Sequence, residues 1–146
     1  MIIRSFLESD ERAVTRLWDE VFPGEPVWND ARESIRRKLG HQRELFFVAE
    51  LNDIIVGTAM AGFDGYRGWV YYVAVAPEQR NKGIGAQLME NVEKALAGIG
   101  CPQLNLLVRH ASIEAASFYR HLGYSVEPKI CMGKVLNTML DSVQDR

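Results

Sequence analysis

Hydrophobic positions follow a period of two in some segments of the chain and a period near 3.6 in others, which predicts strands and helices respectively. Strands are expected where β-branched and aromatic residues gather between turn-forming residues. The predicted order is strand, helix, helix, strand, strand, strand, helix, strand, helix, strand. The corresponding ranges are 2–6, 10–22, 30–39, 45–50, 54–63, 69–75, 84–99, 104–108, 115–122 and 130–136.

This order predicts an α+β fold with one mixed, mostly antiparallel sheet. Asn52 and Asp53 separate two β-rich runs and should form the tight turn of a hairpin. A helix separates the strands at 69–75 and 104–108, which favours a parallel pair joined by a right-handed crossover. We find no internal repeat, low-complexity tract or linker. The whole chain, residues 1–146, is therefore predicted to form a single domain.

Composition and charge argue against several classes of function. Of the 146 residues, 47% are hydrophobic and 25% are charged, as in ordinary globular domains. The formal charge of -2 argues against a nucleic-acid partner. No stretch reaches the roughly 20 apolar residues that span a bilayer, and the N-terminus lacks a signal segment, so we expect no membrane partner and a cytoplasmic protein. Cys101 and Cys131 fit no metal-binding pattern, so we expect free thiols and no metal.

The segment APEQRNKGIGA places two glycines at the start of an otherwise good amphipathic helix. Glycine inside a helix costs about 1 kcal/mol relative to alanine, so another requirement should favour it. A helix N-terminus offers unpaired backbone N–H groups; Gly83 and Gly85 leave them accessible, and Arg80 and Lys82 add positive charge. The pattern therefore predicts a phosphate site, with a merely flexible helix start as the alternative. It matches neither GxGxxG nor GxxxxGK[ST], which points to the pyrophosphate of another cofactor.

Two motifs resemble those of the GNAT superfamily of acyl-CoA-dependent N-acetyltransferases. The segment YYVAVAPEQRNKGIGAQL contains the family's R/Q-x-x-G-x-G/A signature as Arg80, Gly83 and Gly85. The segment ASIEAASFYRHLGY at 111–124 is similar to the second motif, N-x-x-A-x-x-F-Y-x-x-L-G-F/Y. The element order also matches over nearly the whole chain, which looks most similar to small bacterial YpeA-type members. The resemblance implies a GNAT fold, splayed between the fourth and fifth strands, with acetyl-CoA as co-substrate.

The resemblance also implies roles for individual residues. Tyr119 matches the general acid that protonates the departing thiolate, and a phenol of pKa about 10 suits this role at neutral pH. The alternative for Tyr119 is a core aromatic beside Phe118. The family often has Asn where this chain has Ser112, so that contact with the cofactor should be weaker. The implied cofactor-binding residues are Val73 and Val75 for the pantetheine arm, Arg80, Asn81, Lys82, Gly83, Ile84, Gly85 and Ala86 for the pyrophosphate, and Ser112.

The two strands expected to flank the cleft provide no general base. Many relatives carry a glutamate there, whereas 69–75 and 104–108 contain no carboxylate. Deprotonating a lysine-like amine at pH 7 costs about 4.6 kcal/mol, but an α-amine costs only about 1 kcal/mol. An α-amine or another weakly basic amine is therefore the easier acceptor. Asp64, Glu44 or Asp30 could act as base through a water molecule; we select Asp64, with turn formation as its alternative role.

Aromatic residues gather in the segments expected to border the acceptor. We select Trp28, Tyr66 and Tyr71 as substrate-binding candidates, with core packing as the alternative for each. Together these features predict an enzyme that moves an acetyl group from acetyl-CoA to a primary amine, of a small molecule or a peptide, by direct attack in a ternary complex. The alternative is a non-catalytic acyl-CoA sensor or regulatory module. The apolar C-terminal strand offers an edge, so a homodimer is a further possibility that the sequence suggests.

Overall fold

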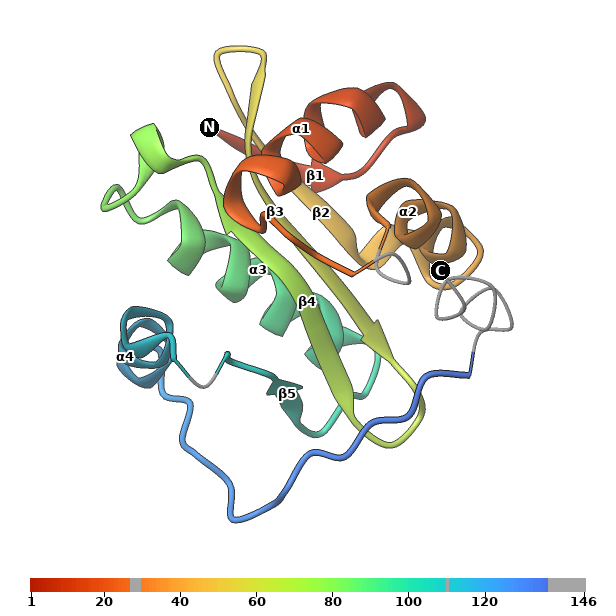
Figure 1. Ribbon diagram of the computed structural model, residues 1–146, viewed down its shortest axis with the longest axis vertical. Coiled ribbons are helices and arrows are strands. Elements are labelled where there is room, and N and C mark those ends of the chain that lie inside the picture. The colour runs from red at the N-terminus through yellow and green to blue at the C-terminus, as the bar shows by residue number, and fades with distance from the viewer. Residues whose placement is uncertain (27–29, 110, 137–146) are drawn as a thin grey trace.

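The protein is built on a five-stranded sheet whose strands lie side by side in chain order (Figure 1). The computed structural model describes residues 1–26, 30–109 and 111–136. The first four strands pair antiparallel, and the fifth pairs parallel to the fourth, so the predicted mixed α+β fold is confirmed. The strands are β1 (Ile2–Ser5), β2 (Phe46–Leu51), β3 (Ile54–Phe63), β4 (Gly68–Val75) and β5 (Leu104–Leu106); the helices are α1 (Glu11–Val21), α2 (Ala31–Leu39), α3 (Ile84–Gly98) and α4 (Ile113–His121).

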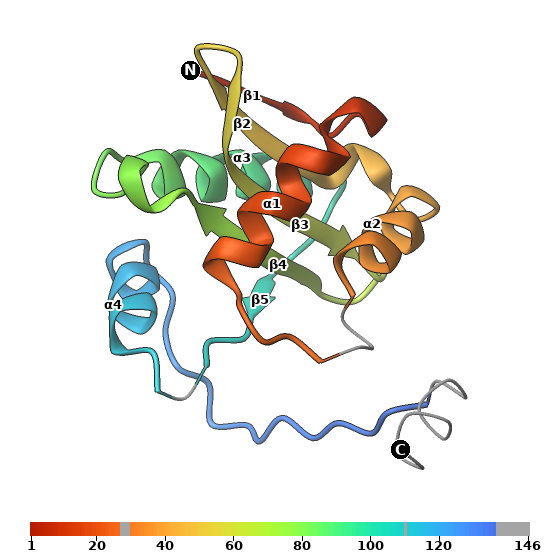
Figure 2. The ribbon, with the colours of Figure 1, turned by 45° about the horizontal axis from the view of Figure 1, so that its top comes forward.

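Helices cover both faces of the sheet, and alternate strand residues face opposite layers (Figure 2). Phe46 and Val48 of β2 pack in one core with Trp18 of α1. Phe47, between them in sequence, packs in a second core with Leu88 of α3. Helix α4 joins the α3 side through partly buried aromatic residues. Within the described part of the chain, no helix is long and apolar enough to cross a membrane.

Short polar segments form the turn between β2 and β3 and the start of α2. Asn52 and Asp53 both adopt a positive φ, of 51° and 63°, as a type I′ hairpin turn between β2 and β3 requires. The Asp30 carboxylate accepts a hydrogen bond from the backbone N–H of Glu33 and so caps α2. The predicted hairpin is confirmed. The turn fixes where β3 begins, and residues of β3 line the cleft described below.

The strand predicted at 130–136 is wrong, because the described residues in that range form no strand. The segment is extended and runs past the lower ends of β4 and β5 in Figure 1, and the side chains of Ile130 and Met132 are each 90% exposed. Asn105 of β5 donates a hydrogen bond to the carboxylate of Glu127, so a side-chain contact replaces a backbone ladder just before this segment. Pro128 also has no N–H to give to a ladder. The alternation of apolar residues correctly indicated an extended segment, but it could not show whether another strand would pair with that segment.

Candidate active site

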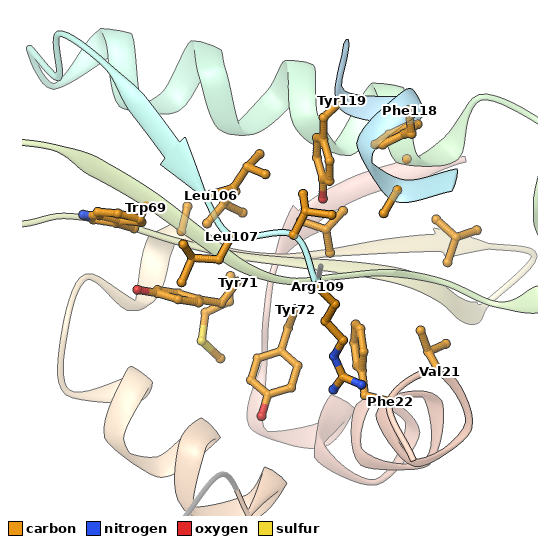
Figure 3. A pocket seen from close by; sticks show the side chains of 18 of the residues that line it. Val21, Phe22, Trp69, Tyr71, Tyr72, Leu106, Leu107, Arg109, Phe118 and Tyr119 are labelled. Atoms are coloured by element: carbon orange, nitrogen blue, oxygen red, sulfur yellow. The ribbon is translucent and has the colours of Figure 1, made fainter. Parts of the chain in front are cut away.

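A cleft of about 1470 Å³ opens where β4 and β5 separate (Figure 3). Gly68 to Val70 pair with Leu104 to Leu106, after which β4 continues to Val75 while β5 ends. The far half of β4 therefore faces the loop after β5 and helix α4 instead of a neighbouring strand. This geometry agrees with the predicted splay between the fourth and fifth strands.

Most of the residues selected from the sequence lie together along this cleft. Lys82 and Tyr66 do not line it, and Trp28 falls outside the described residues. Within the described residues, no group of three His, Cys, Asp or Glu side chains could hold a metal ion. The selected residues that do line the cleft are Asp64, Tyr71, Val73, Val75, Arg80, Asn81, Gly83, Ile84, Gly85, Ala86, Ser112 and Tyr119.

The N-terminus of α3 forms an open cradle at one end of the cleft. Asn81 and Gly83 both adopt left-handed conformations, with φ of 63° and 80°, and Gly83 is the residue that precedes the first turn of α3. A Cβ on Gly83 would meet nothing within 4 Å, so the space over the first helical N–H groups is open. Arg80 lies beside this space, where its Nε donates to the carbonyl of Val75 at 3.3 Å. The first turn of α3 contains no acidic residue, so an anion can approach the positive end of the helix dipole.

Gly85 has a packing role that the sequence did not indicate. A Cβ on Gly85 would lie 3.0 Å from Cζ of Phe118 on α4. The absence of a side chain therefore allows α4 to approach the start of α3 closely. Because Tyr119 is the next residue along α4, Gly85 helps to set the position of that side chain.

Tyr119 directs its hydroxyl into the cleft (Figure 3). Its ring packs edge-on against Phe118 and Tyr124, with centroid separations of 4.9 and 5.8 Å. Burial raises the pKa of Tyr119 to about 12, and its hydroxyl donates no hydrogen bond to any residue in the described part of the chain. The side chain is therefore a neutral O–H donor aimed at the cleft throughout the physiological pH range.

A β-bulge interrupts β4 in the part of the strand that lines the same cleft as Tyr119. Thr58 pairs with Ala74 and Met60 pairs with Tyr71, so the single residue between them on β3 faces two residues on β4. One of these two is Tyr72, which has a positive φ of 52°. A bulge of this kind interrupts the ladder and turns backbone groups toward new directions. In this part of the cleft, some backbone N–H and C=O groups of β4 are therefore not paired with β3.

Thr58 holds this bulge through two hydrogen bonds. Its buried hydroxyl donates to the Tyr72 carbonyl at 2.7 Å and accepts from Nε1 of Trp18 at 2.9 Å. The Trp18 and Tyr72 rings also stack, with centroids 3.8 Å apart. Thr58 was not predicted as a site residue, because its only signal in the sequence is one hydroxyl in an apolar strand.

Replacing Thr58 by valine should destabilise the protein by about 2 kcal/mol, because the Trp18 N–H and the Tyr72 carbonyl would lose a buried partner. Thr58→Ser retains the hydroxyl and serves as the matched control. Urea unfolding measures both changes. Equal stability of the two variants would show that the hydroxyl does not hold the bulge.

The other end of the cleft combines aromatic and charged side chains. Phe22, Tyr71 and Tyr72 line it, and Lys38 enters from α2. An ion pair between Glu25, after α1, and Arg109, after β5, crosses this end. The arrangement can accept a ligand that has both apolar and charged groups.

Asp64 has the turn role that was the alternative to catalysis. Its Oδ1 accepts hydrogen bonds from the backbone N–H groups of Tyr66 and Arg67, each at 2.8 Å. These bonds lower the pKa of Asp64, so its carboxylate is a weaker base than an ordinary aspartate. Tyr66 is 71% exposed, and the Arg67 guanidinium lies 4.2 Å from its ring centroid, outside the cleft.

Sequence comparisons identify similar proteins over nearly the full chain. A sequence model described as "Acetyltransferase (GNAT) family" matches residues 11–124. An acetyltransferase of Yersinia pestis, strain Pestoides F, is 42% identical over 136 residues, which are 93% of this chain and 96% of the relative. An acetyltransferase of Pectobacterium atrosepticum has the same identity and the same coverage.

Solved structures with the same fold include two aminoglycoside N-acetyltransferases. The AAC(6')-Ig enzyme of Acinetobacter haemolyticus has a TM-score of 0.76 and 14% identity, covering 94% of this chain and all of its own. The AAC(6')-Iy enzyme, in complex with the bisubstrate analogue CoA-S-monomethyl-acetylneamine, has a TM-score of 0.77 and 16% identity, covering 93% of this chain and 98% of its own. At these identities the likeness concerns the fold alone.

Proposed function

Because the chain belongs to the GNAT family of acetyltransferases, we propose that it transfers an acetyl group from acetyl-CoA to a primary amine by direct attack in a ternary complex. The observation that carries this proposal is the cleft itself. One continuous space joins the open N-terminus of α3 to the Tyr119 hydroxyl and to the aromatic end beyond the bulge. A long ligand can therefore place its phosphates at one end and its reactive group in the middle.

The residues at the start of α3 fit the pyrophosphate of coenzyme A. The open space over Gly83 lets phosphate oxygens reach the first N–H groups of the helix, and Arg80 adds positive charge. Hydrogen bonds from N–H groups to a charged oxygen contribute about 1.5–3 kcal/mol each, so two or three outweigh the cost of the glycines. The β4 residues Val73 and Val75, along the same wall, would bind the pantetheine arm through their backbone groups.

The central residues support acyl transfer. Bound acetyl-CoA supplies an acetyl group activated as a thioester. The bulge at Tyr72 and Val73 can direct a backbone N–H toward the thioester carbonyl and stabilise negative charge on its oxygen. After the neutral amine nitrogen has attacked and formed the new C–N bond, Tyr119 would donate its proton to the sulfur as the C–S bond breaks. The proton that the nitrogen loses would pass to water, from which the Tyr119 oxygen regains a proton.

The carboxylates of the cleft favour a weakly basic amine as acceptor. Of the three carboxylates that line the cleft, Glu25 is paired with Arg109, Asp64 is engaged in its turn, and Glu114 is exposed in the first turn of α4. Without a dedicated base, an amine that is already largely neutral near pH 7 to 8 reacts most easily, and an α-amine meets this condition better than a lysine side chain.

Calorimetry with acetyl-CoA and thiol release with a panel of primary amines test the proposal. We expect a Kd between about 1 μM and 1 mM and acetyl transfer to at least one α-amine. Binding without thiol release from any amine would favour the acyl-CoA sensor, for which the engagement of Glu25 and Asp64 is the supporting observation. Absence of binding would refute both functions.

A further inference from the structure

Lys38 places an ammonium group against the floor of the acceptor end. It belongs to the last turn of α2, and its Nζ donates to the carbonyl of Ala61 on β3. The Nζ also lies beside Gly62, where a Cβ would come within ordinary contact distance of it, 3.6 Å. The side chain lines the cleft and is partly buried. A flexible lysine is thus held at a defined point of the site.

This ammonium has no carboxylate within ion-pair distance among the residues that the structure describes. Arg36, two residues earlier on α2, pairs with Glu33 at 2.6 Å, whereas Lys38 donates to the neutral carbonyl of Ala61. Burial lowers the pKa of Lys38, and Glu44 opposes this effect only through longer-range attraction. A partly buried charge without a counter-ion is costly, so a ligand that carries an anion would relieve this cost.

The sheet register places Lys38 close to the reacting centre. Ala61, which accepts its hydrogen bond, is two residues along β3 from Ala59, the residue that faces the bulge. Two residues of strand correspond to about 7 Å. Because the proposed function puts the thioester carbonyl beside the bulge, an anion bound to Lys38 would lie in the same part of the cleft as the attacking nitrogen.

We propose that Lys38 binds a carboxylate of the acceptor, so that the acceptor is an amino acid or a similar small amino carboxylate. This inference rests on the proposed acetyl transfer. The carboxylate of a free amino acid favours protonation of its own amine, and the Lys38 charge would offset this effect and so increase the fraction that can attack. The same charge, with Arg37 also lining the cleft, disfavours a polycationic acceptor such as an aminoglycoside.

Matched pairs of α-amino acids and their α-carboxamides test this role, because each pair differs only in the carboxylate. Wild type and Lys38→Met are compared by kcat/KM for both members of a pair. We expect the preference for the acid over the amide to fall at least tenfold in the variant, mainly through KM. The acid-to-amide ratio of kcat/KM is compared between wild type and variant, so the difference in basicity between the two amines cancels.

Three controls separate this inference from the proposed function and from misfolding. Arg36→Met changes an exposed cation on the same helix and should leave the ratio unchanged. Lys38→Arg keeps the charge and should retain part of the preference. Calorimetry with acetyl-CoA should give the same Kd for wild type and Lys38→Met, which shows that the variant is folded.

An unchanged acid-to-amide ratio in Lys38→Met would overturn the inference while leaving acetyl transfer intact. If no amine causes thiol release from acetyl-CoA, the proposed function fails. The role of Lys38 is then tested by the binding of product analogues. In that case N-acetyl amino acids should bind the CoA-loaded wild type at least tenfold more tightly than N-acetyl amino amides, but should lose this advantage in Lys38→Met. Equal binding of the two compounds to wild type would overturn the inference.

Discussion

Replacing Tyr119 by phenylalanine should lower kcat about 100-fold, because general acids typically contribute that much or more to a transfer reaction. The substitution removes one hydroxyl, whereas the ring keeps its edge-on contacts with Phe118 and Tyr124. The Kd for acetyl-CoA should therefore change less than threefold. Thiol-release assays at saturating substrate give kcat, and calorimetry gives the Kd for acetyl-CoA.

The pH dependence follows from the same hydroxyl. Burial raises the pKa of Tyr119 to about 12, so the protonated form that can donate is present at all lower pH values and is lost only as pH rises through about 12. Between pH 6 and 9 the wild-type rate should rise as the acceptor amine loses its proton, with no fall caused by Tyr119. The phenylalanine variant should show the same rise at a lower rate.

Tyr124→Phe is the matched control for the loss of a tyrosine hydroxyl. Tyr124 packs against Tyr119, but its own hydroxyl donates to the Glu93 carboxylate at 2.5 Å and does not line the cleft. We expect its kcat to stay within about twofold of wild type. If Tyr119→Phe retains the wild-type kcat across pH 6 to 9, Tyr119 is not the acid and is a packing residue only.

Local patterns in the sequence were sufficient for most of the elements. The turn at Asn52 and Asp53 depends on residues close in sequence, so its role could be predicted. The glycine-rich start of α3 was recognisable for the same reason. The predicted strand at 130–136 failed because strand formation depends on a free edge in a suitable register, which the segment's own residues do not specify.

The parts of the site that escaped prediction depend on contacts between distant segments. Thr58 acquires its role only where Trp18 and the Tyr72 carbonyl meet it across two other elements. In the sequence, Lys38 looks like any lysine near a helix C-terminus. Only its hydrogen bond to the carbonyl of Ala61 on β3 distinguishes it. Asp64 had both an acid–base and a turn interpretation, and the turn role became visible only with the two backbone N–H groups that donate to its carboxylate.

Gly85 provides a second test with a large expected effect, because two explanations for it make different predictions. Gly85→Val should weaken acetyl-CoA binding about 100-fold, and Gly85→Ala should weaken it about tenfold. In the packing explanation, a Cβ 3.0 Å from Cζ of Phe118 pushes α4 away and widens the cleft. In the direct explanation, the new side chain keeps the pyrophosphate from the backbone N–H groups of α3.

Gly98→Ala is the matched control, because Gly98 also belongs to α3 but a Cβ there would meet nothing within 4 Å. It should stabilise the protein by about 0.5–1 kcal/mol without changing acetyl-CoA affinity. The double variant Gly85→Ala with Phe118→Leu separates the two explanations, since a smaller side chain on α4 makes room for the Cβ. Calorimetry should show that this double variant recovers most of the lost affinity. Failure to recover would mean that Gly85 serves the approach of the phosphates directly, and that the contact between α3 and α4 does not control the width of the cleft.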